Sequence, residues 1–226
     1  MRRLFLIMLL LPVLIVCSGS KDNGRVIVCF GDSITNGGGS WESPSWVLHL
    51  ERLIAEDKEP GEVTVINSGI GGHTTVNALE RIERDVIRYK PAVVLVEFGI
   101  NDSGNWKQEN KLRFNVSHPQ YHFNLVKIVS LIQANTEAVV IMVANHNINR
   151  PEPMPMGLSH GEANRDYNET VREIADHQGL LLLDMEKEFP SGEDGYLRED
   201  GVHLSLKGNR TYAEIVYRAL TGWGLF

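Results

Sequence analysis

The feature that most constrains this chain is an alternation of short apolar runs with longer amphipathic segments. The apolar runs are rich in β-branched residues, which is typical of strands buried on both faces of a sheet. They cover residues 25–30, 63–66, 92–98, 138–144 and 180–184. Between these runs, apolar residues recur at helical spacing, which indicates helices. A helix between two consecutive strands is the crossover connection that joins parallel strands. The sequence therefore predicts an α/β fold, a three-layer α/β/α sandwich with a five-stranded parallel sheet.

Local signals place helices between these strands. Ser43 and Pro44 are interpreted as the N-cap and first residue of a helix, because serine accepts from free N–H groups and proline lacks one. Thr74 or Thr75 can cap the next helix, and Ser205 can cap the last. The other predicted helices cover about residues 119–134 and 162–177.

The first 18 residues have the order of a secretory signal, which leaves residues 19–226 as one domain. Two arginines precede an apolar run of 13 residues, and small residues follow it. This run is shorter than the roughly 20 residues that a membrane-spanning helix needs. Two cleavage sites are possible. An ordinary signal peptidase would cleave after Ser18, whereas lipoprotein processing would cleave before Cys17, which would then carry lipid. We expect an exported protein, either secreted, periplasmic or lipid-anchored at Cys17, without a membrane span.

Composition excludes several classes of protein. A hydrophobic share of 42% with 23% charged residues is typical of a globular chain and not of a disordered or collagen-like one. The net charge is −7 and no run of Lys or Arg exceeds two residues, so we expect no nucleic-acid partner. Signal removal or lipidation would leave Cys29 as the only free thiol, so we predict no internal disulfide.

Polar motifs follow the predicted strands, at the edge where parallel sheets collect functional groups. In chain order they are Phe30-Gly-Asp-Ser33, Asn67-x-Gly-x-Gly-Gly72, Gly99-x-Asn101-Asp102 and Asp200-x-x-His203. Together they closely resemble the four blocks of the GDSL family of serine esterases and lipases, in its SGNH-hydrolase form. The resemblance spans about residues 25–220 and departs from the family name only at Ile34, where leucine is usual. It implies a flavodoxin-like sandwich and an ester hydrolase that needs no cofactor.

These motifs contain the groups that a serine hydrolase uses. A serine hydroxyl is a weak nucleophile until a base lies within hydrogen-bond reach. We expect Ser33 to be the nucleophile and His203 the base, since imidazole can take and return a proton near neutral pH. Asp200, three residues before His203, can orient the ring through its other nitrogen. Asp184 is the rival for this orienting role.

The resemblance also implies an oxyanion hole, the set of donors that stabilises the tetrahedral intermediate. Its members would be the backbone N–H groups of Ser33 and Gly72 and the side-chain amide of Asn101. Glycine at position 72 allows a positive φ. The alternatives are a helix cap for Ser33, a surface position for His203, a turn residue for Asn101 and a purely conformational role for Gly72.

Five further polar residues lie near these motifs. Asp32 and Asp102 are interpreted as acceptors that brace loops, and Glu97 as an acceptor of hydrogen bonds from neighbouring loops. His73 and His146 follow the second and fourth predicted strands. They are interpreted either as solvated loop histidines or as residues that touch the substrate.

No metal or cofactor is predicted. The run 69–74 lacks the third glycine of a dinucleotide-binding motif, and no phosphate-binding P-loop motif occurs. His118 and His122 have a spacing that can bind zinc on a helix, but Pro119 lies between them and no carboxylate pattern accompanies them.

The substrate is expected to be a small-molecule or glycan ester. The loop at residues 149–163 is the expected pocket wall, because its prolines limit its conformations and its methionines offer adaptable apolar surface. No long apolar segment suggests a lipid tunnel, which favours short acyl groups such as acetyl on a carbohydrate. The alternatives are a lysophospholipase or thioesterase acting on longer chains, and a catalytically silent carbohydrate-binding lipoprotein.

Overall fold

A computed structural model describes residues 25–37, 44–108, 111–190 and 195–226, and the expected export signal with Cys17 lies outside these ranges. Five parallel strands form the central sheet, in the order β2-β1-β3-β6-β7. Their bounds are β1 Arg25–Gly31, β2 Val63–Gly69, β3 Val93–Glu97, β6 Val139–Ala144 and β7 Leu181–Asp184. The order is that of flavodoxin-like sheets, whose ligands bind at the carboxyl ends of the strands.

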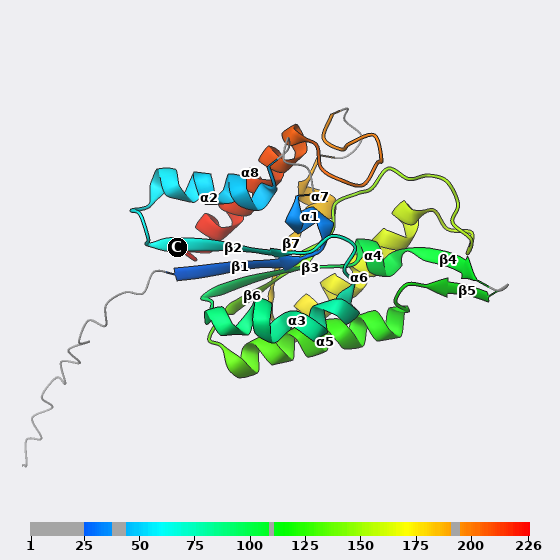
Figure 1. Ribbon diagram of the computed structural model, residues 1–226, viewed down its shortest axis with the longest axis horizontal. Coiled ribbons are helices and arrows are strands. Elements are labelled where there is room, and N and C mark those ends of the chain that lie inside the picture. Colours follow the sequence, from blue (N-terminus) through cyan, green and yellow to red (C-terminus); the bar gives the residue numbers. More distant parts are fainter. Residues whose placement is uncertain (1–24, 38–43, 109–110, 191–194) are drawn as a thin grey trace, which may run out of the picture.

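Helices cover both faces of this sheet (Figure 1). On one face lie α2 (Trp46–Asp57) and α8 (Leu206–Gly222), and on the other lie α3 (Thr75–Asp85), α5 (His118–Asn135) and α6 (His160–Gln178). The strands supply both cores by alternation, since Ile27 and Cys29 face one layer and Val28 and Phe30 face the other. The predicted three-layer α/β/α sandwich is confirmed.

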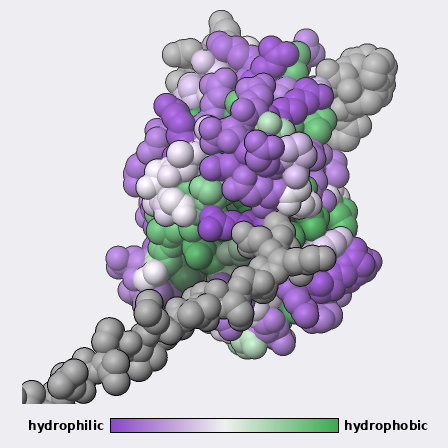
Figure 2. Space-filling view, turned by 90° about the vertical axis from the view of Figure 1, so that its left-hand side faces the viewer, coloured by the Kyte–Doolittle hydropathy of each residue, from purple (hydrophilic) through white to green (hydrophobic). Residues whose placement is uncertain are grey.

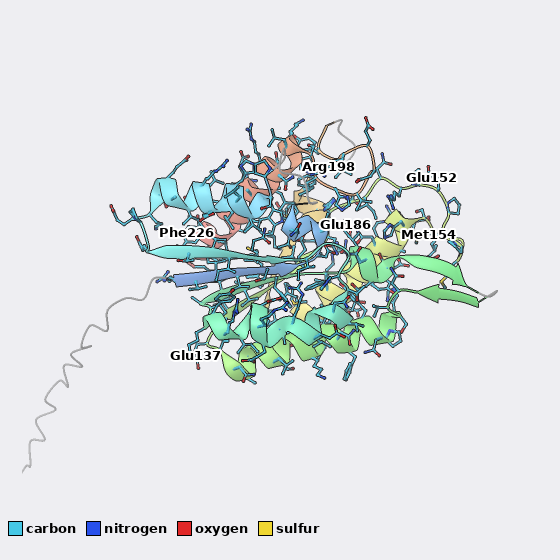
Figure 3. All side chains as sticks on the ribbon, in the orientation of Figure 1. Glu137, Glu152, Met154, Glu186, Arg198 and Phe226 are labelled. Atoms are coloured by element: carbon cyan, nitrogen blue, oxygen red, sulfur yellow. The ribbon has the colours of Figure 1, made fainter. Side chains whose placement is uncertain are left out.

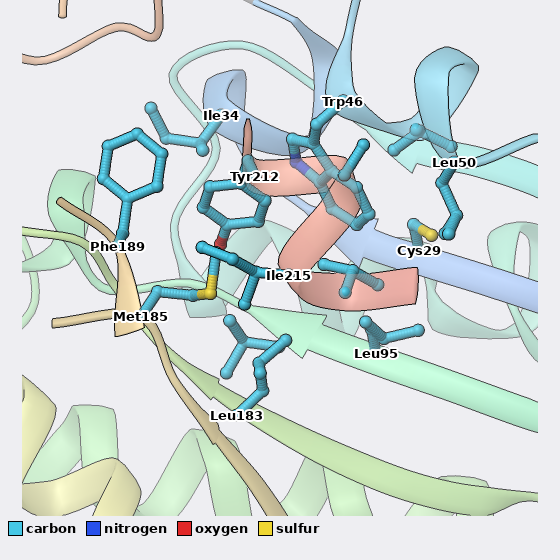
Figure 4. Packing of buried hydrophobic residues seen from close by; sticks show 14 of the residues in the cluster. Cys29, Ile34, Trp46, Leu50, Leu95, Leu183, Met185, Phe189, Tyr212 and Ile215 are labelled. Carbon is cyan, nitrogen blue, oxygen red and sulfur yellow. The ribbon is translucent and has the colours of Figure 1, made fainter. Parts of the chain in front are cut away.

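Aromatic side chains fill the core beneath α2 and α8 (Figure 4). The ring centroids of Trp46 and Tyr212 are 5.2 Å apart, and Phe189 lies 5.7 Å from Tyr212. All three are almost fully buried. Because burying rings of this size dominates core energetics, the packing fixes the first turns of α8. The loop that ends at His203 directly precedes this helix.

The start of α2 differs from the prediction. Ser45 is the N-cap and Trp46 the first helical residue, while Pro44 precedes the helix and Ser43 lies outside the described residues. A tertiary contact accounts for this start, because the N–H of Trp46 donates to Asn209 Oδ1 of α8 at 2.8 Å. That bond, together with the buried indole, outweighs the preference of proline for a first helical position.

The other predicted caps are confirmed, with Thr74 before α3 and Ser205 before α8. A short antiparallel hairpin between the third strand and α5 was not predicted. Its strands are β4 (Asn105–Gln108) and β5 (Lys111–Phe114). The remaining elements are short: α1 (Ser33–Asn36), the 3-10 helix η1 (Ile87–Tyr89), α4 (Ile100–Ser103) and α7 (Met185–Glu188).

The two ends of the sheet differ in character. Figure 2 looks onto the amino ends of the strands, where hydrophobic residues gather between hydrophilic surroundings. Val139, the first residue of β6, is 38% exposed. The carboxyl ends instead carry the polar motifs. Within the described ranges, no helix has both the length and the apolar character needed to cross a membrane.

Candidate active site

The three residues expected to carry catalysis form one chain of hydrogen bonds. His203 Nε2 lies 3.0 Å from Ser33 Oγ, and His203 Nδ1 lies 2.7 Å from Asp200 Oδ2. Ser33 follows β1 directly, whereas the other two lie in the loop before α8, 170 residues away in the case of His203. A hydroxyl, an imidazole and a carboxylate are thus joined in the order that serine hydrolase chemistry uses.

Ser33 does not cap the helix that it begins. The cap of α1 is Asp32, whose Oδ1 accepts from the N–H of Ile34 at 2.9 Å. The alternative reading of Ser33 as a helix cap is therefore wrong. Its hydroxyl is directed to His203, and the short helix holds it at the carboxyl end of β1.

Asp200 lies in a polar and partly exposed setting. The side chains of His203 and Asp200 are 30% and 37% exposed. Besides the imidazole, Asp200 accepts from the backbone N–H groups of Val202 and His203. Partial burial alone would raise the pKa of Asp200, but these hydrogen bonds outweigh it and lower the pKa to about 2. The carboxylate is ionised at neutral pH and ready to orient the ring.

Asp184, the rival orienter, has other partners. It ends β7, where its carboxylate pairs with Arg172 at 2.8 Å and with Lys187 at 2.7 Å. Arg172 also pairs with Glu186 of α7 at 2.7 Å. The structure brings Asp200, and not Asp184, to His203.

Gly72 lies in a turn that passes beside the serine. Its φ of 77° confirms the expected positive value, a conformation that residues with a Cβ rarely adopt. A Cβ placed on the preceding Gly71 would lie 3.9 Å from the Cβ of Ser33. The turn therefore passes within ordinary van der Waals distance of Ser33.

Asn101 is fixed between the loops that follow the first two strands. Its Nδ2 donates to the carbonyl of His73 at 3.1 Å and lies 3.3 Å from Asp32 Oδ2. Its own carbonyl accepts from Asn115 Nδ2 at 2.7 Å. The structure thus brings all five residues expected in the site to one edge of the sheet.

Buried carboxylates lie beneath this edge and accept hydrogen bonds. Asp102 Oδ1 accepts from both the N–H and the hydroxyl of Thr75, at 3.0 and 2.5 Å. Glu97 accepts from the hydroxyl of Thr35 at 2.5 Å and from the phenol of Tyr212. Their interpretation as hydrogen-bond acceptors is confirmed, although both donors to Glu97 come from helices, Thr35 from α1 and Tyr212 from α8, and not from loops.

Burial changes the acidity of these groups. Asp32, Glu97 and Asp102 are each at most 1% exposed. Loss of solvent raises the pKa of all three, to about 6 for Asp102, and the neighbouring Glu97 raises that of Asp32 further. They differ in this respect from Asp200, whose pKa is lowered.

Sequence reasoning did not identify Arg81 of α3 as a residue that holds the site. Its guanidinium is 4% exposed and donates to the carbonyls of Gly31 and Ser68, each at 2.8 Å. An ion pair with Asp85 at 3.1 Å balances its charge. The two carbonyls lie near the ends of β1 and β2, so Arg81 ties together the strands that lead into the serine and glycine loops.

The interpretation of His146 as a solvated or substrate-contacting residue is wrong. His146 is fully buried, so it is neither solvated nor placed to touch a substrate. Its Nε2 lies 2.9 Å from the carbonyl of Val202, in the loop of Asp200 and His203. His73 does contribute to the site, through its backbone carbonyl.

The loop expected to form a pocket wall lies at the same end as the site. Figure 3 shows its residues Glu152 and Met154 beyond the carboxyl ends of the strands, with Glu137 and Phe226 at the other end. Because α6 begins at His160, the loop itself ends before that residue. Its tip carries apolar surface at Met156 and Leu158, which are 37% and 38% exposed.

Metal-binding and thiol chemistry have little support among the described residues. Across those ranges, no three His, Cys, Asp or Glu side chains are grouped so that they could hold a metal ion. The ring of His118 packs against Tyr167, with centroids 4.0 Å apart. Cys29 is a buried free thiol in β1.

Comparisons with known proteins agree on the relationship of this chain. It is 27% identical to the uncharacterized lipoprotein YqeF of Bacillus subtilis, over 96% of each chain. It is 27% identical to an arylesterase of Vibrio mimicus, over 95% of this chain and 98% of the other. It is 25% identical to an acetylxylan esterase of Geobacillus stearothermophilus, over 88% of this chain and 94% of that one.

A solved structure and a family model support the same relationship. The lipase/acylhydrolase from Enterococcus faecalis superposes with a TM-score of 0.70 at 28% identity, covering 88% of this chain and 96% of that one. The model of the GDSL-like lipase/acylhydrolase family matches residues 29–211, which include all four motifs. The chain therefore belongs to the GDSL-like lipase/acylhydrolase family.

Proposed function

We propose that this protein is an exported serine ester hydrolase that removes a short acyl group, acetyl above all, from a polar alcohol such as a carbohydrate. The observation that carries the proposal is the hydrogen-bonded chain from Ser33 through His203 to Asp200. In this arrangement the imidazole can take the proton of the hydroxyl while the carboxylate holds the ring, which activates a serine as a nucleophile.

The reaction would proceed through an acyl-enzyme. Ser33 Oγ attacks the ester carbonyl as His203 Nε2 takes its proton, and the C–O bond to the alcohol breaks as the imidazolium returns that proton to the leaving oxygen. A water molecule then attacks the acyl-enzyme, again with His203 as base, and releases the acid. Asp200 keeps the ring in the tautomer that leaves Nε2 free to accept.

The developing oxyanion would be stabilised by the N–H groups of Ser33 and Gly72 and by the amide of Asn101. The positive φ of Gly72 and the approach of its turn to Ser33 support this assignment. The bond from Asn101 Nδ2 to the His73 carbonyl orients the amide, and the longer contact to Asp32 Oδ2 at 3.3 Å is the one that the oxyanion would replace, because the amide nitrogen has only two N–H donors. A donor held in place by a neighbouring carbonyl needs little reorganisation in the transition state.

Three observations support a short acyl group on a polar alcohol. The base and its orienter are 30% and 37% exposed, which suits a site approached from solvent. Near the serine the chain presents a glycine turn, and the amides of Asn101 and Asn115 lie at the same edge, which suits a polar alcohol. A relative along most of the chain is an acetylxylan esterase. Export is supported by the order of the first 18 residues and by the lipoprotein relative.

The decisive test is hydrolysis of p-nitrophenyl acetate, butyrate and octanoate, and of acetylated xylo-oligosaccharides, by the parent chain and by Ser33→Ala. We expect the acetyl esters to be the best substrates and Ser33→Ala to lose at least about 10³-fold in kcat. Ser130→Ala, which alters a serine on the exposed side of α5, is the matched control and should keep parental activity.

Other outcomes would identify the alternatives. Preference for octanoate would replace the short-acyl assignment with a longer-chain esterase. A folded parent chain no faster than Ser33→Ala on every ester, yet able to bind xylo-oligosaccharides, would indicate a carbohydrate-binding protein. Covalent labelling of the parent by a fluorophosphonate, absent in Ser33→Ala, reports the activated serine independently of the substrate.

A further inference from the structure

The loop that carries His203 is hydrogen-bonded to segment 146–150, which follows β6. Three successive carbonyl groups of the loop each accept one hydrogen bond from it. The pairs are His146 Nε2 with Val202 (2.9 Å), the Asn149 N–H with Gly201 (2.7 Å) and Arg150 Nε with Asp200 (3.0 Å). A Cβ at Gly201 would lie 2.0 Å from the Asn149 carbonyl oxygen, so the two backbones meet without space for a side chain.

His146 is the buried member of this set. It is 0% exposed, and its ring packs edge-on against Phe189 and Tyr212, at centroid distances of 5.6 and 6.3 Å. Because a carbonyl can only accept, Nε2 must carry the proton that bonds to Val202. Burial lowers the pKa of His146 to about 4, so the ring is neutral at neutral pH and adds no charge beneath His203.

This contact fixes the peptide that joins Val202 to His203. A trans peptide is planar, with its C=O and N–H on opposite sides. His146 holds the carbonyl of that plane, and Asp200 Oδ1 accepts its N–H at 2.9 Å. Because both the carbonyl and the N–H of this peptide group are hydrogen-bonded, the orientation of the peptide is fixed. The direction in which the His203 side chain leaves the backbone is fixed with it.

His146 is itself anchored by α6. The side-chain amide of Asn168 accepts from the N–H of Asn145 at 2.8 Å and donates to its carbonyl at 2.9 Å, as a neighbouring strand would. Asn164 Nδ2 donates to the carbonyl of His146 at 3.1 Å. All four residues are fully buried. A rigid connection therefore runs from α6 through His146 to the loop of the base.

We propose that His146 is a positioning residue of the reaction, whose Nε2–H donor aligns the imidazole of His203 by fixing the peptide before it. The proposal rests on the serine hydrolase function proposed above. Misplacement of a catalytic group by about 1 Å can cost about 10²-fold in rate, so the effect of losing this donor should be measurable.

The test compares His146→Phe, His146→Gln and His146→Asn in the full chain. Phenylalanine keeps a ring against Phe189 and Tyr212 but has no donor, and the glutamine amide places an N–H at the same number of bonds from the backbone as Nε2. The asparagine amide is one bond shorter. We expect kcat to fall about 10- to 100-fold for Phe and Asn with little change in KM, and to recover largely for Gln.

A spectroscopic readout separates alignment from general damage. The proton shared by His203 Nδ1 and Asp200 Oδ2 should give a low-field proton resonance in the parent chain and in the Gln variant, which weakens or broadens in Phe and Asn. The same change at an exposed histidine, His177→Phe at the end of α6, is the matched control and should alter neither kcat nor the resonance.

Several results would overturn the proposal. One is a folded Phe variant with parental kcat and an intact resonance. Another is a folded Gln variant as impaired as Phe, since a restored N–H donor would then restore no activity. If the Phe variant does not fold, equal kcat and equal resonances for Gln and Asn would refute it. If Ser33→Ala keeps full activity, the proposed function fails, and the resonance still decides whether His146 orders the loop.

Discussion

Asp200 and Asp102 are the same residue type near the same edge of the sheet, but their surroundings differ sharply. Asp200 is 37% exposed and accepts from an imidazole and two backbone N–H groups, and its pKa is lowered to about 2. Asp102 is fully buried, accepts from Thr75 through Oδ1, and has its pKa raised to about 6.

The difference shows that the pKa of a carboxyl group depends on its hydrogen-bond donors and on its exposure to water, since both groups belong to aspartates. In the proposed mechanism Asp200 has to remain ionised to orient the base, and the hydrogen bonds of the loop before α8 favour its ionised form. A carboxyl that braces two loops needs only to accept hydrogen bonds. Replacing each by asparagine, which is close in shape and uncharged, should therefore affect catalysis at position 200 and the pH dependence of stability at position 102.

The largest effect is expected for Asp200→Asn. Asparagine can still accept from the two backbone N–H groups, so the loop should remain folded. The amide does not hold the imidazole in the productive tautomer, and kcat should fall about 10³- to 10⁴-fold. Steady-state kinetics on p-nitrophenyl acetate measures this, with the thermal unfolding midpoint as the control for folding. A loss of less than tenfold would remove Asp200 from its proposed role.

The next largest effect is expected for Asn101→Ala, at the position just before Asp102. Loss of one oxyanion donor typically costs about 10²- to 10³-fold in kcat, with a small change in KM. Asn101→Asp should be at least as impaired, because a carboxylate there would repel the oxyanion and Asp32. Retained kcat in Asn101→Ala would assign this residue a role in loop geometry alone.

Asp102→Asn should change the pH dependence of stability and leave kcat nearly unaltered. A folded-state pKa of about 6, above the unfolded value near 4, means that the folded chain binds the extra proton between these values. Stability then falls as the pH rises from about 4 to about 6, by up to about 3 kcal/mol.

The Asp102→Asn variant should lack the fall in stability that the ionisation of Asp102 causes. It should therefore be more stable than the parent near neutral pH. Urea unfolding at several pH values measures the difference between the two chains, which isolates Asp102 from Glu97 and Asp32, whose raised pKa values act with the same sign. Parallel curves for parent and variant would contradict the assignment of this titration to Asp102.

The smallest effect is expected for Asp184→Asn. This substitution weakens a partly buried ion pair with Arg172, for a loss of about 1 kcal/mol in the free energy of unfolding. Catalysis should be unchanged, because Asp184 pairs with Arg172 and Lys187 and not with His203. A reduction in kcat comparable to that of Asp200→Asn would show that both carboxylates orient the base.

Much of the fold could be predicted because buried strands of a parallel sheet are continuous apolar runs. The positions of Ser33, Asn101 and His203 followed from the same rule, since motifs at strand ends converge at one edge. The hairpin β4–β5 could not be predicted in this way. Its strands have four residues each, which are mostly polar, and they form a separate two-stranded sheet, so they carry little apolar periodicity.

The roles of Arg81 and His146 depend on tertiary contacts that no local pattern encodes. One signal was nevertheless present for Arg81. It lies on the same helical face as the buried Ala78 and Ile82, and a charge on an apolar face needs buried partners. His146 carried no comparable signal, because it follows a strand in a polar run that is typical of an exposed loop.

The polarity of the sheet also determines how the molecule would be presented on a cell surface. The described chain enters β1 at Arg25, at the amino end of the sheet, whereas Ser33 lies at the other end. A lipid at Cys17, the lipoprotein alternative above, would tether the domain by the residues between 18 and 24, whose reach is at most about 25 Å. With such a tether, the edge of the sheet that carries Ser33 would lie on the side of the domain opposite to the anchored chain end.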